Sequence, residues 1–541
     1  MTNKILPIAD LKHNGNSASA TSSSGNHATK PRPSRNTADN GSNCRPIGAE
    51  ASAKTTLPKI NAGIADLAAM TRVALKILKT ANNPPYLFRH GGLPAWLEYG
   101  DDGAPFARTL TEDHLRHELA RTMQWGVVKD KKWVSVLPPS HVVKDILATP
   151  NLHLPILESI VQTPVFGRDG SLQMAPGYHT ASRSYYLPEP GFAAPVIPEK
   201  PSPTELAQAR NLLLDELTGD FPFVSDPDRA HTIAFSLLFY ARQLIKGPTP
   251  LHLFEKPTPG TGATLLVDVL SRPATGRPLP AMSEGGDDEE CRKRITAMLR
   301  NIPAAIHIDN VRRPLDSAAL AAAITATVWE DRILGHSRTA RLPVRCVWLA
   351  TANNPVLSNE ITRRTIRIRL DAKIERPWLG REFRHPNLMA WVEEHRMELV
   401  HAHLVLIQTW IAAGRPKGST KLGMFECWSE VMGGILEVAG IPGFLGNLPE
   451  FYQEADSESD AFREFVDDWW SELKNQSVGV DDLLETAQRR LDLEGGTAQA
   501  QRIRLGKLLA RNRDRLFGPL RLEKAAKYQG SCQYRLVSIQ P

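Results

Sequence analysis

Four short apolar runs alternate with helical patterns in the middle of the chain. Each run is short, and the residues between the runs repeat their apolar positions every three to four residues, as in amphipathic helices. Apolar strands separated by helices are typical of a parallel sheet covered on both faces. The pattern therefore predicts an α/β core with a mainly parallel sheet, whose strands cover residues 251–255, 304–309, 345–351 and 365–370.

The segments outside this core have different patterns. Residues 1–55 are rich in Ser, Asn, Ala, Thr and Gly and have no aromatic residue, so we expect a disordered tail. Residues 56–195 combine an alanine-rich amphipathic helix with short strands, which predicts an accessory α+β domain. The core is expected to cover 200–386 and a helical lid or linker region 387–470, while 471–541 form a separate terminal domain.

The predicted terminal domain has the element order of a winged helix. Helical patterns cover 481–491 and 497–511, and a hairpin-like segment follows at 521–539. Four apolar residues of the second helix are expected on its inner face: Ile503, Leu505, Leu508 and Leu509.

Composition is that of a folded protein without a membrane span. The chain has 541 residues, of which 42% are hydrophobic and 23% are charged. No apolar run approaches the roughly 18–20 residues that cross a bilayer. The five cysteines lie far apart and include no C-x-x-C pair, so neither a zinc site nor a disulfide framework is indicated. We expect a cytoplasmic protein.

Positive charge is concentrated at the C-terminal end. Residues 501–541 contain ten Lys and Arg against two acids, a net of +8, so the rest of the chain nets −2 of the total +6. Such a concentration predicts DNA as a partner. A solvated basic surface on a docking domain is the alternative. The expected DNA-binding residues are Arg502, Arg504, Lys507, Arg511, Lys524 and Lys527.

A turn with the pattern of a phosphate-binding loop follows the first apolar run. Residues 257–262 read Pro-Thr-Pro-Gly-Thr-Gly, and a helical pattern begins at Thr264. A strand, a loop and a helix in this order direct backbone N–H groups at phosphate oxygens. The candidate nucleotide-binding residues are Pro259, Gly260, Thr261, Gly262, Ala263, Thr264 and Leu265.

The loop lacks the lysine of the usual pattern G-x-x-x-x-G-K-[ST]. In that pattern the lysine contacts the β- and γ-phosphates, and the Ser or Thr hydroxyl binds Mg²⁺. Here Ala263 occupies the lysine position and Pro257 the first glycine position. Lys256 is close in sequence but precedes the turn, so we expect it on the wrong side of the loop to replace that lysine.

The second predicted strand ends in an acid. Asp309 follows the apolar run about 45 residues after the loop, where a carboxylate could hold the Mg²⁺ of a nucleotide. An ordinary Asp at a strand end is the alternative. Asn310 comes next, at a position that in ATPases is often a water-orienting Glu.

Two further pairs of residues come next along the chain. Asn353 and Asn354 end the third strand, where an amide could contact the γ-phosphate; the Asn-Asn-Pro sequence is also a plain turn signal. Arg363 and Arg364 precede the fourth strand, where a guanidinium could reach the nucleotide of a neighbouring subunit.

These four signals in this order resemble the AAA+ class, specifically the superfamily 3-like helicase ATPases of phage, plasmid and integrated-element replication proteins, including poxvirus-type primase-helicases. The resemblance is best over residues 200–400. It implies a P-loop AAA+ core that binds ATP and Mg²⁺, with Thr264 and Asp309 at the metal. Asn353 or Asn354 would be the sensor, and Arg363 or Arg364 the arginine finger. It also implies a homo-oligomeric ring, DNA and other replication proteins as partners.

Two departures leave the activity open. Loss of a preorganised group such as the loop lysine costs on the order of 3–4 kcal/mol of transition-state stabilisation. Asn310 also removes a carboxylate that could orient water. The chain is therefore interpreted as an ATP-dependent DNA helicase or translocase of a mobile genetic element. The alternative is a catalytically degenerate AAA+ protein that acts as a DNA-binding assembly or loading factor; a DNA-binding regulator with a purely structural core is a third reading.

Overall fold

The computed structural model describes six stretches of the chain. They are residues 57–333, 339–379, 382–455, 457–493, 496–528 and 531–539. The predicted tail at 1–55 lies outside the described residues. No helix among the described residues is long and apolar enough to cross a membrane.

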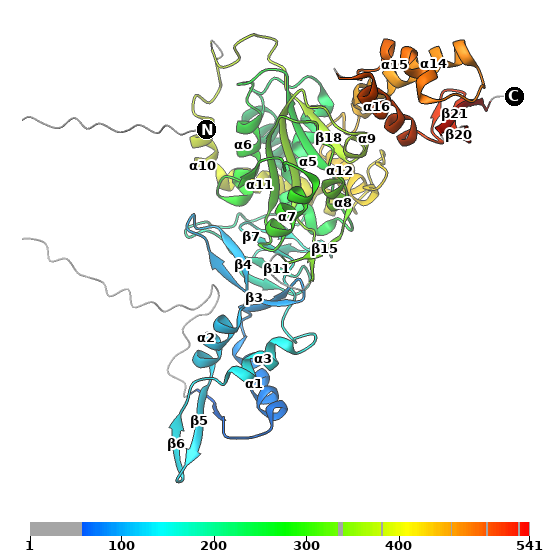
Figure 1. Ribbon diagram of the computed structural model, residues 1–541. Helices are drawn as coiled ribbons and strands as arrows, with labels where there is room; N and C mark the ends of the chain where they lie inside the picture. Colours follow the sequence, from blue (N-terminus) through cyan, green and yellow to red (C-terminus); the bar gives the residue numbers. More distant parts are fainter. Residues whose placement is uncertain are drawn as a thin grey trace, which may run out of the picture. The chain divides into compact units, whose positions relative to one another are not determined.

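A five-stranded, all-parallel sheet forms the centre of the protein (Figure 1). This confirms the prediction of an α/β core with a parallel sheet. The three inner strands are almost completely buried, which explains why they read as continuous apolar runs. In spatial order the strands are β13 (Ala281–Met282), β14 (Ala305–Val311), β17 (Val347–Asn353), β12 (Leu251–Lys256) and β18 (Thr365–Arg369).

Helices pack around this sheet. The helix α5 (Asp226–Ala241) begins with a proline in its first turn, buries most of its residues, and packs the Phe235 ring 5.1 Å from that of Phe254 in β12. The other helical segments are α4 (Pro203–Asn211) with a π-helical extension (Leu212–Leu217), the short 3₁₀ turn Arg242–Leu244, α6 (Ala263–Thr275), α7 (Asp288–Leu299), α8 (Ala318–Thr325), α9 (Asn359–Thr362), α10 (Leu388–Glu394), α11 (Arg396–Ala412), α12 (Glu426–Val438) and α13 (Leu448–Ala455).

One hydrophobic core joins the sheet to these helices. It contains Phe166 and many residues between Ala209 and Phe451, among them fully buried residues of α5, α6, α11 and α12. The helices after β18 therefore share the core of the sheet. Between α8 and β17 the chain forms an antiparallel pair of strands, β15 (Val328–Arg332) and β16 (Thr339–Pro343).

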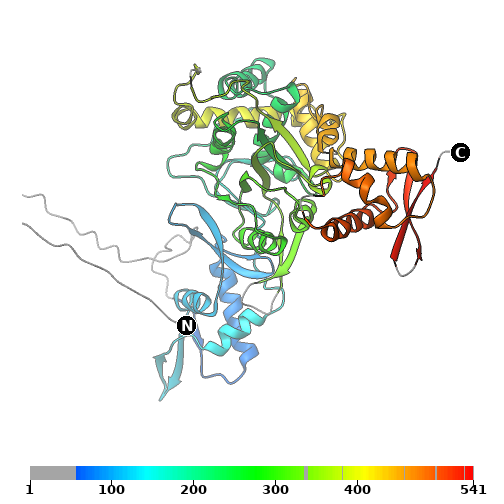
Figure 2. The same cartoon turned by 45° about the horizontal axis from the view of Figure 1, so that its top comes forward.

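The region before the sheet mixes short strands and helices (Figure 2). Two hydrophobic clusters fill it, one around Trp96 and Trp125 and one around Phe88 and Tyr185. Its helices are α1 (Leu67–Ala81), α2 (Glu112–Thr122) and α3 (Ser140–Ala148). Its strands are β1 (Lys59–Asn61), β2 (Leu87–His90), β3 (Leu93–Tyr99), β4 (Pro105–Thr109), β5 (Gln124–Lys129), β6 (Lys132–Ser135), β7 (Ser159–Val161), β8 (Val165–Phe166), β9 (Leu172–Gln173), β10 (Gly177–His179) and β11 (Ser184–Tyr186).

The C-terminal part has its own hydrophobic cluster, centred on Phe465, Trp469 and Leu505. Three helices and a three-stranded antiparallel sheet surround it. They are α14 (Ser457–Leu473), α15 (Val480–Arg490), α16 (Ala498–Arg511), β19 (Leu516–Phe517), β20 (Leu520–Tyr528) and β21 (Ser531–Ser538).

One residue of the predicted inner face of α16 is placed differently. Leu505 and Leu509 are fully buried and Leu508 is partly buried, but Ile503 is 52% exposed. Ile503 precedes Leu505 by two residues, and two residues correspond to about 200° around a helix. The expectation for Ile503 is therefore wrong.

Candidate functional site

An open cavity of about 650 Å³ lies at the carboxyl edge of the parallel sheet. The strands β12, β14 and β17 are adjacent and parallel, so their C-terminal residues meet there although they are far apart in sequence. The cavity is lined by Lys256, Pro259, Thr264, Asp309, Asn310, Val311, Arg312, Thr351 and Asn353. A volume of this size suits a small organic ligand.

The predicted phosphate loop forms one wall. Gly260 and Gly262 have φ of +81° and +108°, a conformation that glycine adopts without strain. The Thr261 hydroxyl donates to the Thr258 carbonyl at 2.6 Å and closes the turn. Helix α6 then begins at Ala263 without a side-chain cap, so its first N–H groups remain available to a ligand.

The residues at the start of α6 point in different directions. Thr264 is exposed and lines the cavity, as predicted for a residue that contacts nucleotide and metal. Ala263 is fully buried in the hydrophobic core, and Leu265 is exposed but does not line the cavity. The structure thus brings Pro259 and Thr264 of the predicted set to the cavity wall.

The acidic strand end is held by a hydroxyl from the next strand. Asp309 Oδ1 accepts a hydrogen bond from Thr351 Oγ1 at 2.6 Å. The same oxygen of Thr351 accepts the Asn310 N–H at 2.7 Å. The register of β14 shifts between Ile308 and Val311, and Asn310 has a φ of +53°. Through this irregularity both Asp309 and Asn310 line the cavity.

A buried histidine lies beside the acid. The Nε2 atom of His307 is 3.6 Å from Asp309 Oδ1, and it has no hydrogen-bond partner among the described residues. Burial lowers the pKa of His307, although the nearby charge of Asp309 acts in the opposite direction. His307 is therefore neutral near pH 7, and the charge of Asp309 stays available to a cation.

Lys256 is the main correction to the sequence analysis. It is the last residue of β12, and its side chain lines the same cavity as Thr264 and Asp309. The turn folds back, so that the end of the strand and the start of α6 face one space. Burial lowers the pKa of Lys256, while the charge of Asp309 partly offsets this effect. The expectation that Lys256 lies on the wrong side of the loop is wrong.

The two predicted sensor residues differ in position. Asn353 is in register with Lys256 in the β12–β17 pair and lines the cavity. Asn354 has a φ of +38°, and its N–H donates to the Lys256 carbonyl at 3.1 Å. Asn354 is not among the lining residues. Asn353 is therefore the asparagine with access to a ligand, and Asn354 holds the two strand ends together.

The two predicted arginines lie at the opposite edge of the sheet. Both precede β18, whose first residue is in register with the first residue of β12. The cavity begins at the other end of β12, about 17 Å away at roughly 3.3 Å per residue. Arg364 is largely buried and donates to the Glu360 carbonyl at 2.7 Å, whereas Arg363 is exposed. Neither arginine lines the cavity of its own chain.

An aromatic side chain covers the outside of the loop. A Cβ atom at Gly260 would lie 2.5 Å from the Trp378 ring, so the loop and the indole are in close contact. The Trp378 side chain is nevertheless 59% exposed and does not line the cavity. The cavity therefore remains open beside this contact.

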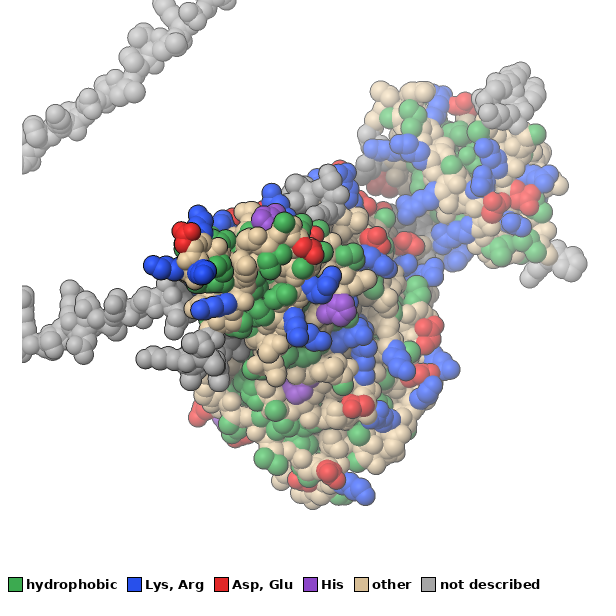
Figure 3. Space-filling model, turned by 90° about the horizontal axis from the view of Figure 1, so that it is seen from below, with side chains coloured by type: hydrophobic (Ala, Val, Ile, Leu, Met, Phe, Trp, Pro, Cys, Tyr) green, Lys and Arg blue, Asp and Glu red, His purple; other side chains and the backbone are tan. Residues whose placement is uncertain are grey.

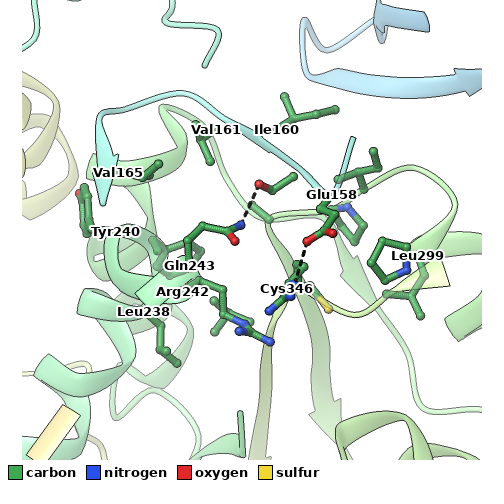
Figure 4. Close-up of a pocket in the computed structure, with 18 residues that line it drawn as sticks. Glu158, Ile160, Val161, Val165, Leu238, Tyr240, Arg242, Gln243, Leu299 and Cys346 are labelled. Carbon is green, nitrogen blue, oxygen red and sulfur yellow. Dashed lines mark hydrogen bonds and ion pairs between the residues drawn. The ribbon is translucent and has the colours of Figure 1, made fainter. Parts of the chain in front are cut away.

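A second, smaller cavity of about 50 Å³ lies between residues 158–165 and the sheet region (Figure 4). Glu158 forms ion pairs with Arg168 and Arg183 at 2.7 Å and with Arg345 at 3.3 Å. Burial, followed by the charge of Arg345, lowers the pKa of Arg242 to about 9, and Arg242 donates to three main-chain carbonyls. These side chains form a brace that joins two parts of the chain.

The predicted DNA-binding residues are partly engaged with other residues. Arg502 forms an ion pair with Asp481, and Arg504 donates to the Leu493 carbonyl at 2.6 Å. The side chain of Lys527 lies outside the described residues. The exposed residues of the predicted set are Arg504, Lys507 and Arg511 on α16 and Lys524 on β20. Figure 3 shows Lys and Arg side chains on the surface of this C-terminal part.

No family model and no curated protein matches the chain. Among solved structures, an A-form apo structure of the NrS-1 C-terminal region has 12% identity and a TM-score of 0.36, covering 86% of this chain and 98% of that chain. A second A-form structure of that region has 11% identity and a TM-score of 0.35, covering 86% and 99%. Cch of SCCmec type IV, described as an active helicase, has 10% identity and a TM-score of 0.32, covering 83% and 91%.

Proposed function

We propose that the cavity binds the triphosphate of ATP together with Mg²⁺, and that the protein is an ATP-dependent DNA helicase or translocase of a mobile genetic element. One observation carries the proposal: Lys256, Thr264 and Asp309 line a single cavity at the carboxyl edge of a parallel sheet. Ligands of such sheets bind at this edge. The uncapped start of α6 adds N–H groups suited to phosphate oxygens.

The oxygen donors of the cavity fit Mg²⁺. Magnesium binds oxygen ligands and takes few of them from the protein, because phosphate oxygens and water complete its shell. Thr264 supplies a hydroxyl and Asp309 a carboxylate. The described residues contain no cluster of three or more His, Cys, Asp or Glu that would form an independent metal cage. Bound Mg²⁺ would neutralise charge on the phosphates during transfer.

The arrangement of the arginines supports a ring of subunits. Arg363 is exposed at the edge of the sheet opposite to the cavity, so in this proposal it acts on the nucleotide of a neighbouring copy and not on that of its own chain. In this proposal the core at 200–386 and the helical region at 387–470 form a superfamily 3-like AAA+ unit, and 56–195 form an accessory domain.

The C-terminal part supports DNA as the partner. We assign residues 471–541 as a winged helix, whose helix α16 presents Lys507 and Arg511 and whose hairpin presents Lys524. Exposed cations on one helix and on an adjoining hairpin suit contacts to the phosphates of a duplex.

Substitution of the acid tests the proposal. ATP hydrolysis by the full chain, with Mg²⁺ and DNA, should fall at least about 100-fold in Asp309→Asn, because a group that stabilises charge in the transition state is lost. Asp113→Asn is the matched control, since Asp113 is an exposed aspartate in α2. If wild type and Asp309→Asn hydrolyse ATP equally, the cavity is not the ATPase site.

A second candidate is a DNA-binding assembly factor with a degenerate site. Two observations favour it: Ala263 is buried where a loop lysine would begin, and Asn310 occupies the position of a water-orienting carboxylate. In this case the wild type would bind Mg²⁺-ATP and DNA without turnover. Measuring binding and hydrolysis on the same preparation separates the two candidates.

A further inference from the structure

We propose that Lys256, at the end of β12, supplies the phosphate-binding cation that the loop lacks at Ala263. This inference rests on the proposed function, because it assigns a role within the same nucleotide site. The cation would come from the strand that precedes the loop instead of the helix that follows it.

The position of Lys256 carries the inference. Its side chain lines the cavity together with Thr264 and Asp309, the two residues proposed to hold the metal. A lysine has a long flexible stem and three donors, so it can follow phosphate oxygens as a point charge. The backbone of Lys256 is fixed by pairing with Asn353 and by the hydrogen bond from the Asn354 N–H.

The charged ammonium group of Lys256 is partly removed from water, and a phosphate bound nearby would stabilise it. Lys256 is half-buried, and among the described residues no carboxylate lies within ion-pair distance of its Nζ. Asp309 is near enough to influence it but does not pair with it directly. A partly desolvated cation without a direct partner is stabilised by an anionic ligand.

Ala263 cannot easily take this role. Its side chain is fully buried in the core formed with Leu266 and Val267, and it does not line the cavity. A lysine at position 263 would have to displace packed apolar atoms before it reached the ligand. Loss of the usual lysine and presence of Lys256 in the cavity therefore describe one rearranged site.

The experiment compares nucleotide affinities of full-length variants. Lys256→Met removes the charge and keeps the length of the side chain, so it should weaken ATP binding about 10- to 100-fold. The loss should be smaller for ADP and absent for AMP, because the contact is to the outer phosphates. Lys256→Arg should recover part of the ATP affinity. Lys246→Met is the matched control, because Lys246 is an exposed lysine outside the cavity.

The outcomes separate this inference from the proposed function. A wild type that binds neither ATP nor ADP would overturn both. A wild type that binds ATP, together with a Lys256→Met variant of equal affinity, would overturn the inference alone. Thermal unfolding without nucleotide shows that Lys256→Met is folded, since loss of a half-buried charge should leave the melting temperature unchanged or raise it. An equal loss of ATP and AMP binding would also contradict a phosphate contact.

Discussion

The hydroxyl of Thr351 fixes the acidic end of β14 because it acts as a hydrogen-bond donor and as an acceptor at once. It donates to Asp309 Oδ1 at 2.6 Å and accepts the Asn310 N–H at 2.7 Å. Asn310 has a φ of +53°, which is uncommon for a residue other than glycine. The hydroxyl therefore stabilises a strained backbone and orients the carboxylate before any ligand arrives.

Replacement of Thr351 by valine tests this role. Thr351→Val keeps the shape of the side chain but leaves the Asn310 N–H without its acceptor. We expect the free energy of unfolding to fall by about 1–3 kcal/mol, measured by urea denaturation. Thr351→Ser retains the hydroxyl and should recover most of the loss. Equal stability of the valine and wild-type proteins would show that the hydroxyl does not support the strand end.

Local patterns predicted part of the site, and the rest depended on which strands are neighbours. Asp309 and Thr264 were predicted because each follows a recognisable strand or turn. Thr351 was missed, although it precedes Asn353 by two residues and so shares its face of the strand. A buried charge on the fourth strand was also not predicted: Arg367 is 3% exposed and forms an ion pair with Glu454 of α13.

At the level of elements, ion pairs of the buried Glu158 connect the segment around β7 to the central sheet. Glu158 is buried and forms ion pairs with three arginines, one of which, Arg345, lies two residues before the buried strand β17. The carboxylate offsets the charge of Arg345, which is largely buried, whereas Arg168 and Arg183 are also in contact with solvent. Removal of one partner from such a group leaves uncompensated charge.

Glu158→Gln should therefore be strongly destabilising. We expect a loss of about 3–5 kcal/mol in the free energy of unfolding, measured by chemical denaturation. Glu112→Gln provides the comparison, because Glu112 and Lys144 form an exposed pair at 3.9 Å, which is worth about 0–1 kcal/mol. Similar losses in the two variants would contradict the brace.

The parallel sheet was predictable, but its strand order was not. Apolar runs bounded by turns reveal strands, and the four predicted strands are present. Their order places β17 between β12 and β14, which brings Asn353 and Thr351 into the cavity wall. This neighbour relation arises from packing of the whole core. The hairpin of β15 and β16 was not predicted.

At the scale of the whole molecule, the main core contains three fully buried histidines. Burial lowers the pKa of His231 to about 4, that of His252 to about 3 and that of His403 to about 4. Each is neutral in the folded protein at pH 5, whereas in the unfolded chain, with a pKa near 6.5, each is protonated there. The unfolded chain thus binds more protons, and acid favours unfolding.

Stability should consequently fall as the pH decreases from about 6.5 towards 4. Each histidine contributes about 1.4 kcal/mol per pH unit within this window and nothing above it. Urea denaturation at pH 7, 6 and 5 measures the slope. A His403→Gln variant cannot take up this proton. Its free energy of unfolding should therefore change with pH less steeply, by the contribution of one histidine. An unchanged slope in this variant would show that His403 titrates normally in the folded state.

The contact between Trp378 and the loop makes tryptophan fluorescence a reporter of ligand binding in this protein. Trp378 is the only tryptophan of the described chain with a largely exposed ring, and that ring rests on Gly260. A water-borne collisional quencher such as iodide reaches this fluorophore in preference to the other ten. A ligand that shifts the loop at Gly260 should change this emission, so binding can be followed in the native chain without a dye or a radioactive label.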